Sequence, residues 1–193
     1  MKISLFVIVV MLIGHSCGPK QQGSNFANLS KTRYAHFDKK GIDKIELQII
    51  DSSISDPRYK ELPPLAQVGH GFSFIDSSGK QTCKPTQILI YKDSTKDKLL
   101  TILNSYLDIP QDTTIETACF RIYRHVFTLY NINNQVVDRA YICLDCTRLE
   151  FRRLAADIKF MQDDKKLFSD LIGILRKTNA YVPTYGPASE IAN

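Results

Sequence analysis

The sequence predicts an α+β fold: a small antiparallel sheet with a central β-hairpin and two amphipathic helices packed on one face. Two segments with helical apolar spacing and two neighbouring strand-like segments lead to this prediction. The chain has 193 residues, of which 44% are apolar and 23% are charged. This balance suits a single folded domain and excludes a disordered chain and a multi-span membrane protein.

Both predicted helices carry apolar residues at helical spacing. The first has them at positions i, i+3, i+4, i+7 and i+8: Leu99, Ile102, Leu103, Tyr106 and Leu107. Ser94 or Thr95 is expected to cap its start. Pro110 is expected to end it, because the residue before a proline disfavours the helical backbone. The second helix is predicted from about Asp163 to Lys177, with acidic residues at its start and basic residues at its end, as the helix dipole favours.

The central hairpin is predicted from two segments rich in β-branched and aromatic residues, Arg121–Tyr130 and Gln135–Cys143. Residues 131–134 (Asn-Ile-Asn-Asn) suit the turn between them, because asparagine tolerates a left-handed backbone. Further strands are expected at Ile42–Ile49, Gly71–Asp76 and Gln87–Tyr91. Residues 51–67 hold three prolines and are expected to form a loop. Arg148–Ile158 fits a strand and a helix equally well, so both assignments stay open.

The N-terminal residues have the pattern of an export signal. Lys2 precedes an apolar run from Ile3 to Ile13. As a helix this run would span about 16 Å, roughly half of a ~30 Å hydrocarbon core, so it is not expected to be a stable membrane span. The sequence therefore predicts a signal peptide over residues 1–16.

The residues after the apolar run are Gly14-His15-Ser16-Cys17. They resemble a bacterial lipoprotein signal, although Gly14 stands where such signals usually have leucine. The resemblance implies that Cys17 is lipidated on its sulfur, becomes the new N-terminus and holds the protein on the exported side of the cell membrane or outer membrane. An ordinary signal peptide, cleaved after Ser16, is the alternative.

The rest of the chain is expected to have three parts. Cys17 and the polar residues up to 33 form a flexible tether. Residues 34–180 form one globular α+β domain, and residues 181–193 form an irregular C-terminal tail.

Four cysteines remain besides Cys17: Cys83, Cys119, Cys143 and Cys146. An even number of cysteines in an exported domain indicates disulfides, with three possible connectivities. A hairpin that turns between Ile132 and Asn133 would place residues whose numbers sum to 265 opposite each other, and therefore Cys119 opposite Cys146. Cys83 and Cys143 would then form the second pair.

Two other interpretations of the cysteines stay open. Cys143 and Cys146 have the C-x-x-C spacing of a thiol redox pair, which would need a helix to begin after them and lower the pKa of the first thiol. Only 47 residues follow Cys146, too few for the remainder of a thioredoxin-like domain. A zinc site is less favoured, because strong zinc patterns contain two closely spaced ligand pairs and this chain has one.

No catalytic residue, metal site or cofactor is predicted. The sequence contains no H-E-x-x-H, G-x-S-x-G or P-loop motif. His125 is expected to be structural or to face solvent. Six arginines around the hairpin are interpreted as a solvated face rather than an anion-binding surface: Arg121, Arg124, Arg139, Arg148, Arg152 and Arg153. The formal charge of +5 indicates no particular partner, and nucleic acid is not expected as a partner of an exported protein.

The segment from Cys119 to Cys146 contains an Arg-His pair, an F-x-L-Y strand, an Asn-rich turn and the run Y-I-C-L-D-C. This layout resembles uncharacterised bacterial envelope lipoproteins, which implies a place in the envelope but no activity. The sequence therefore predicts a lipid-anchored, non-enzymatic envelope protein that binds or scaffolds an unidentified partner. The alternative is a thiol-disulfide oxidoreductase that uses Cys143 and Cys146.

Overall fold

The structure is a computed structural model. It describes residues 34–50, 66–68, 71–76, 78–82, 84–109, 122–152, 158–160, 164–184 and 186–191. The chain divides into two compact units, residues 1–32 and 33–193, and every described residue belongs to the second. The predicted signal peptide and tether, together with Cys17, Cys83 and Cys119, lie outside the described residues.

The main sheet has six strands, and all neighbouring strands in it are antiparallel. In spatial order they are β4 (Gln87–Tyr91), β1 (Lys44–Ile49), β6 (His125–Tyr130), β7 (Val136–Cys143), β8 (Arg148–Phe151) and β9 (Ile158–Phe160). The hairpin of β6 and β7 lies in the middle, as the sequence predicts. The assignment that was open between helix and strand is settled for Arg148–Phe151, which is a strand.

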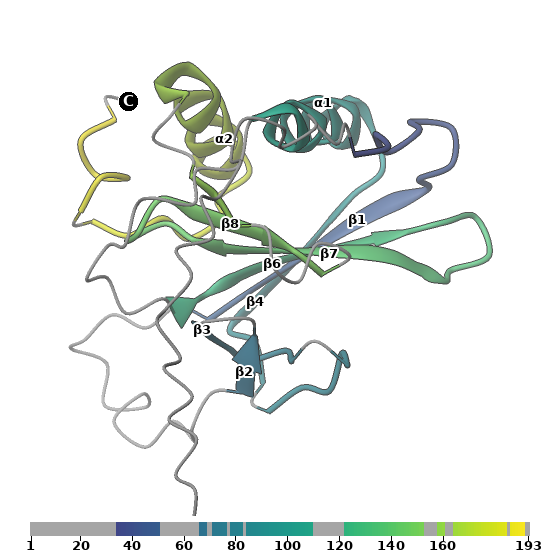
Figure 1. Ribbon diagram of the computed structural model, residues 1–193, viewed down its shortest axis with the longest axis horizontal. Helices are drawn as coiled ribbons and strands as arrows, with labels where there is room; N and C mark the ends of the chain where they lie inside the picture. The colour runs from purple at the N-terminus through teal and green to yellow at the C-terminus, as the bar shows by residue number, and fades with distance from the viewer. Residues whose placement is uncertain are drawn as a thin grey trace, which may run out of the picture. The chain divides into compact units, whose positions relative to one another are not determined.

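Two helices, α1 (Ser94–Asp108) and α2 (Lys165–Lys177), lie on one face of this sheet (Figure 1). The main core lies between them and the sheet, where apolar residues of α1 and α2 such as Leu103 and Leu171 join Leu47, Phe127 and Ile142. Burial of these side chains is the main source of stability for the layer. The predicted α+β class, with a small antiparallel sheet and two helices, is confirmed.

Both helices begin at an aspartate. The carboxylate of Asp93 accepts a hydrogen bond from the Thr95 N–H (2.9 Å), and that of Asp164 accepts one from the Leu167 N–H (2.8 Å). The expected cap at Ser94 or Thr95 is therefore wrong by one or two residues. A carboxylate at this position satisfies an unpaired N–H and also interacts favourably with the helix dipole.

A second, three-stranded sheet was not predicted. It consists of β2 (Ala66–Val68), β3 (Gly71–Ser73) and β5 (Ile122–Tyr123), with β3 and β5 parallel. The expected strand over Arg121–Tyr130 is interrupted at Arg124, so that its first part pairs with β3 and its second part with β1 and β7. This division depends on partners far away in the sequence, and local strand propensity does not show it.

The sheet face opposite the helices carries a smaller apolar cluster, which includes Phe74, Tyr123 and Tyr141. The turn over residues 76–80 packs on it. The Tyr141 hydroxyl donates a hydrogen bond to the Asp76 carbonyl (3.0 Å), and Gly79 lies against the Arg139 guanidinium. The cysteines of the central hairpin belong to this second face.

Candidate functional site

The predicted redox pair lies at the end of a strand. Cys143 is the last residue of β7, and residues 144–147 form a turn in which Thr147 has a φ of +49°. β8 follows directly at Arg148. A helix that would lower the pKa of Cys143 does not begin here, because the chain turns back into the sheet.

Cys143 is a free thiol and is only 1% exposed. Burial raises the pKa of this thiol, and the backbone N–H groups of Ile122 and Cys146 beside the sulfur offset that effect only in part. Cys146, in contrast, is disulfide-bonded, with its partner outside the described residues. The expected pairing of Cys143 with Cys83 therefore differs from this structure, in which Cys143 is unpaired.

The hairpin register differs from the expected one. His125 lies opposite Ile142 and Phe127 opposite Ala140, so facing residues sum to 267 rather than 265. Asn134 adopts a left-handed backbone (φ +58°) in the loop, and the register shifts between Leu129 and Tyr130. Such a residue lengthens the loop and displaces the pairing.

Cys146 lies in the turn after β7, so this hairpin does not place it opposite Cys119. The hairpin geometry therefore no longer supports a disulfide between Cys119 and Cys146, and this pairing stays a prediction.

Polar side chains hold the segment around Cys143 in place. The Arg124 guanidinium forms an ion pair with Asp145 of the 144–147 turn. The Tyr123 hydroxyl donates a hydrogen bond to Glu150 Oε2 (3.0 Å), and both residues are buried. The first contact joins the residue before β6 to the 144–147 turn, and the second joins β5 to β8.

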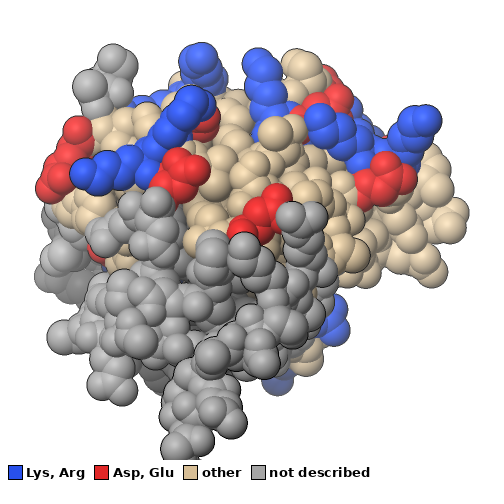
Figure 2. Space-filling view, turned by 45° about the horizontal axis from the view of Figure 1, so that its top comes forward, with Lys and Arg blue, Asp and Glu red and all other residues tan. Residues whose placement is uncertain are grey.

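Arg121 and Arg153 lie outside the described residues, and the four arginines that are described do not form one solvated face. Arg148 is buried, Arg124 is ion-paired and Arg139 packs against Gly79, whereas Arg152 is exposed. On the helix-bearing side, Lys and Arg are interspersed with Asp and Glu (Figure 2). This described surface has no large patch of a single sign, and so lacks the feature that attracts a polyanion.

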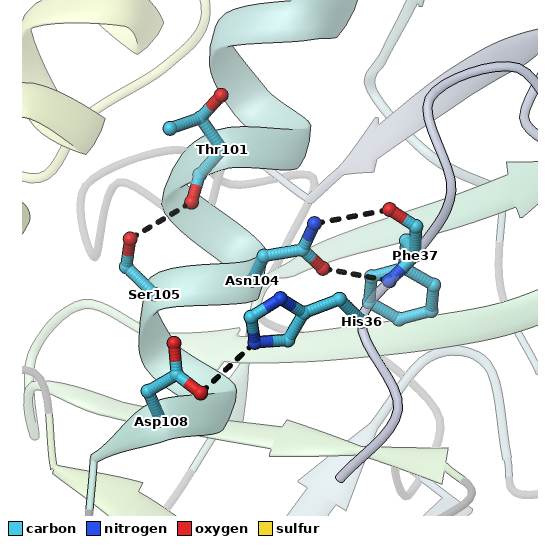
Figure 3. Close-up of polar contacts among 6 residues, drawn as sticks. All are labelled: His36, Phe37, Thr101, Asn104, Ser105 and Asp108. Atoms are coloured by element: carbon cyan, nitrogen blue, oxygen red, sulfur yellow. Dashed lines mark hydrogen bonds and ion pairs between the residues drawn. The ribbon is translucent and has the colours of Figure 1, made fainter. Parts of the chain in front are cut away.

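A serine, a histidine and an aspartate lie near one another at the end of α1 (Figure 3). His36 Nε2 lies 2.9 Å from Asp108 Oδ1, but the Ser105 hydroxyl donates to the Thr101 carbonyl and not to the histidine. The His36 and Asp108 side chains are about half exposed. A nucleophile would need its proton held by the base, so this group does not have the arrangement of a catalytic triad.

The same region shows what holds the N-terminal segment of the domain. The Asn104 amide accepts a hydrogen bond from the Phe37 N–H (2.8 Å) and donates one to the Phe37 carbonyl (3.0 Å). One side chain thus satisfies both polar groups of one backbone residue (Figure 3). The contact fixes the segment before β1 onto α1.

The exposed side chains of β4 form the strongest candidate for a binding surface. Ile88 is 53% exposed and Ile90 is 55% exposed, and both point to the face opposite the helices. Among the described strands, β4 pairs only with β1, so its other side is an edge. We call this surface, made by Ile88 and Ile90 and the outer side of Gln87–Tyr91, the β4 edge.

The sequence interpretation did not identify the β4 edge. The sequence feature that points to it is the run Ile88-Leu89-Ile90, which puts apolar side chains on both faces of the strand. Such a run usually predicts a strand buried on both faces. Here Leu89 packs toward the main core while its two neighbours stay in solvent.

A shallow groove of about 630 Å³ lies beside the C-terminal residues. Its cationic residue, Arg176, donates hydrogen bonds to the carbonyls of Ala188 (3.1 Å) and Ile191, so its guanidinium is already used internally. Within the described ranges, three or more metal-binding side chains nowhere come together. The helices in the same ranges are too short or too polar to cross a bilayer.

Comparisons of this chain with protein-family models, with curated proteins and with solved structures find no match.

Proposed function

We propose that this chain is a lipid-anchored protein of the cell envelope whose folded domain binds or scaffolds a partner and performs no catalysis. Its anchor would be Cys17, at the end of the export signal read from the sequence. The β4 edge is the observation that carries the binding role.

Two isoleucines at i and i+2 on an edge strand are unfavourable in water and invite pairing with another chain. An extended segment can add to such an edge, with main-chain hydrogen bonds giving affinity and the alternate side chains giving specificity. Lys84 and Lys92 are exposed at the two ends of the strand. They discourage uncontrolled aggregation, which is how natural proteins protect an edge that must stay accessible.

The alternative function, a thiol-disulfide oxidoreductase, has less support. A redox pair needs an accessible thiol with a lowered pKa. Cys143 is buried, its pKa is raised by burial, and the residues after Cys146 form a strand. We therefore favour the binding role.

The binding role is tested by placing a photo-crosslinking amino acid at position 90 in cells and, as a matched control, at position 132. Ile132 is even more exposed (79%) but lies on the hairpin loop, away from β4. We expect one defined adduct from position 90, lost on Ile88→Lys, and none from position 132. Equal labelling at both positions, or no adduct at position 90, contradicts the proposal.

The anchor is tested by the intact mass of the protein extracted from its native membrane. A chain that begins at Cys17 and carries the mass of attached acyl groups is expected. The Cys17→Ser variant should lose that mass and leave the membrane fraction. An unmodified chain beginning at Cys17 would overturn the anchor without affecting the crosslinking result.

A further inference from the structure

The residues after α2 return to the sheet and cross the end of three strands. Within residues 178–184 and 186–191, which we call the C-terminal strap, no helix or strand forms (yellow in Figure 1). On the helix-facing side of the sheet, Gln87, Ile49 and His125 are register partners in neighbouring strands. The strap is bonded to both ends of this row.

Gln87 makes one attachment. Its amide donates a hydrogen bond to the Asn179 carbonyl (2.6 Å) and accepts one from the Tyr181 N–H (3.0 Å). Tyr91 and Thr178 add a hydroxyl contact of 2.9 Å. None of these groups titrates near neutral pH, so this part of the attachment does not depend on pH in that range.

His125 makes the other attachment. Its Nε2 donates a hydrogen bond to the Tyr181 carbonyl (2.7 Å), and its ring stacks on the Tyr181 ring, with centroids 6.3 Å apart and planes 10° apart. The side chain is 1% exposed, and its Nδ1 has no hydrogen-bond partner. The neutral ring fits this site, because its unprotonated Nδ1 carries no charge and its burial costs only the loss of a hydrogen bond to water.

A protonated ring does not fit the same site. Among the described residues, no acceptor faces the new N–H and no counter-ion faces the buried positive charge, and both absences are costly. The flanking strands offer Ile49 and Ile142 as register partners. In the part of the chain that the structure describes, the charged group that acts on His125 is the Arg124 guanidinium, which is of the same sign and paired with Asp145.

We propose that the C-terminal strap is a pH-sensitive latch, which His125 keeps closed while its ring is neutral and which opens when the ring takes up a proton. The strap then leaves the sheet end at Tyr181 while the core between the helices and the sheet persists. Opening frees Ala180 and Ala188, both buried in the closed form, and exposes the sheet end that they cover.

The direction of the pH dependence follows from burial, which lowers the pKa of His125 to about 4, whereas a free histidine has a pKa near 6.5. As pH falls below 6.5, His125 takes up a proton in the open form but stays neutral in the closed form. The ratio of open to closed forms therefore rises by up to tenfold per pH unit, and by about 80-fold between pH 6.5 and 4. Above pH 7 the latch does not respond.

Hydrogen exchange of the full mature chain, measured by mass spectrometry from pH 7.5 to 4 and corrected for intrinsic exchange rates, tests the latch. Peptides covering the strap should lose protection by at least tenfold, and peptides covering α1 should keep theirs. In His125→Gln, whose amide still donates to the carbonyl but does not titrate, strap protection should stay constant with pH. Gln87→Leu should lower strap protection at every pH and leave the slope unchanged.

Three results would overturn the proposal. These are strap protection that does not change with pH, an equal loss in His125→Gln, and a parallel loss in α1, which would indicate global unfolding. If His125→Gln does not fold, the exchange measurement on the wild-type chain tests the proposal by itself. The exchange rate of the strap must then follow a one-proton slope below pH 6.5 while α1 stays protected.

Discussion

At the scale of single residues, Gly79 shows how closely the turn over residues 76–80 approaches the sheet. Its φ of +89° lies in the region that side chains rarely adopt. A Cβ at this position would lie 2.5 Å from an Arg139 Nη atom. The glycine is therefore required by the backbone conformation, whereas the Arg139 guanidinium, at the end of a flexible side chain, can move away from a Cβ.

We expect Gly79→Ala to lower the free energy of unfolding by about 1–3 kcal/mol, from the left-handed conformation and the displaced guanidinium. Gly173→Ala is the matched control. Gly173 lies within α2, a Cβ there meets nothing within 4 Å, and we expect a gain of about 0.5–1 kcal/mol. Urea unfolding measures both variants. A neutral Gly79→Ala would show that the turn does not hold residue 79 in the left-handed conformation.

Cys143 gives a second prediction at this scale. Because its thiol is buried and its pKa is raised by burial, the native protein should not be alkylated at Cys143 at pH 7.5, whereas the urea-unfolded protein should be. Peptide mass after alkylation, with and without urea, measures this. Rapid labelling of Cys143 in the native protein would instead favour the oxidoreductase alternative.

At the scale of elements, α1 holds the N-terminal segment through one side chain. Asn104 makes two hydrogen bonds to the backbone of Phe37, and Phe37 itself is buried in the main core beside Phe151. Loss of Asn104 removes two hydrogen bonds from the backbone of a partly buried segment. This element contact is thus worth more than an average surface hydrogen bond.

We expect Asn104→Ala to cost about 1–3 kcal/mol of unfolding free energy. Ser105→Ala, one position further along, should change stability by less than about 0.5 kcal/mol, because Ser105 is bonded only to its own helix and alanine is the better helix former. Chemical unfolding of the two variants compares them directly. An equal effect in both would mean that the contact with Phe37 adds nothing.

At the scale of the whole molecule, the described residues within 181–193 are more than the tail that the sequence suggests. Ala188 is fully buried, and Tyr181, Val182 and Ile191 pack against the main core. Arg176 bonds the carbonyls of the strap from α2. The C-terminal strap therefore closes one side of the core.

A chain that ends at Ala180 should lose about 3 kcal/mol of unfolding free energy or more, because these apolar contacts disappear. Glu190→Ala, at an exposed position of the same strap, should be neutral within about 0.5 kcal/mol. Thermal and urea unfolding report both effects. Equal stability of the shortened and complete chains would restore the interpretation of residues 181–193 as a free tail.

Much of the fold could be predicted because it follows from local patterns. Helical spacing placed α1 and α2 within one or two residues of their ends, and strand composition placed β4 at its exact bounds. The division at Arg124 and the small sheet could not be predicted, since β3 and β5 pair across about 50 residues of sequence. The loop with its left-handed Asn134 and the register shift between Leu129 and Tyr130 together moved the hairpin register, which removed the geometric argument for the pairing of Cys119 with Cys146.

The candidate site was the least predictable part. A free Cys143 beside a bonded Cys146, an exposed Ile90 and a buried His125 each depend on which residues lie across the sheet. The sequence by itself determined the α+β class, the two amphipathic helices and the central hairpin, because the periods of 3.6 and 2 residues report locally which side of each element is apolar. Only the tertiary structure decided which of those sides stays open at β4 and which histidine the strap covers, because burial arises between segments that the chain brings together from far apart.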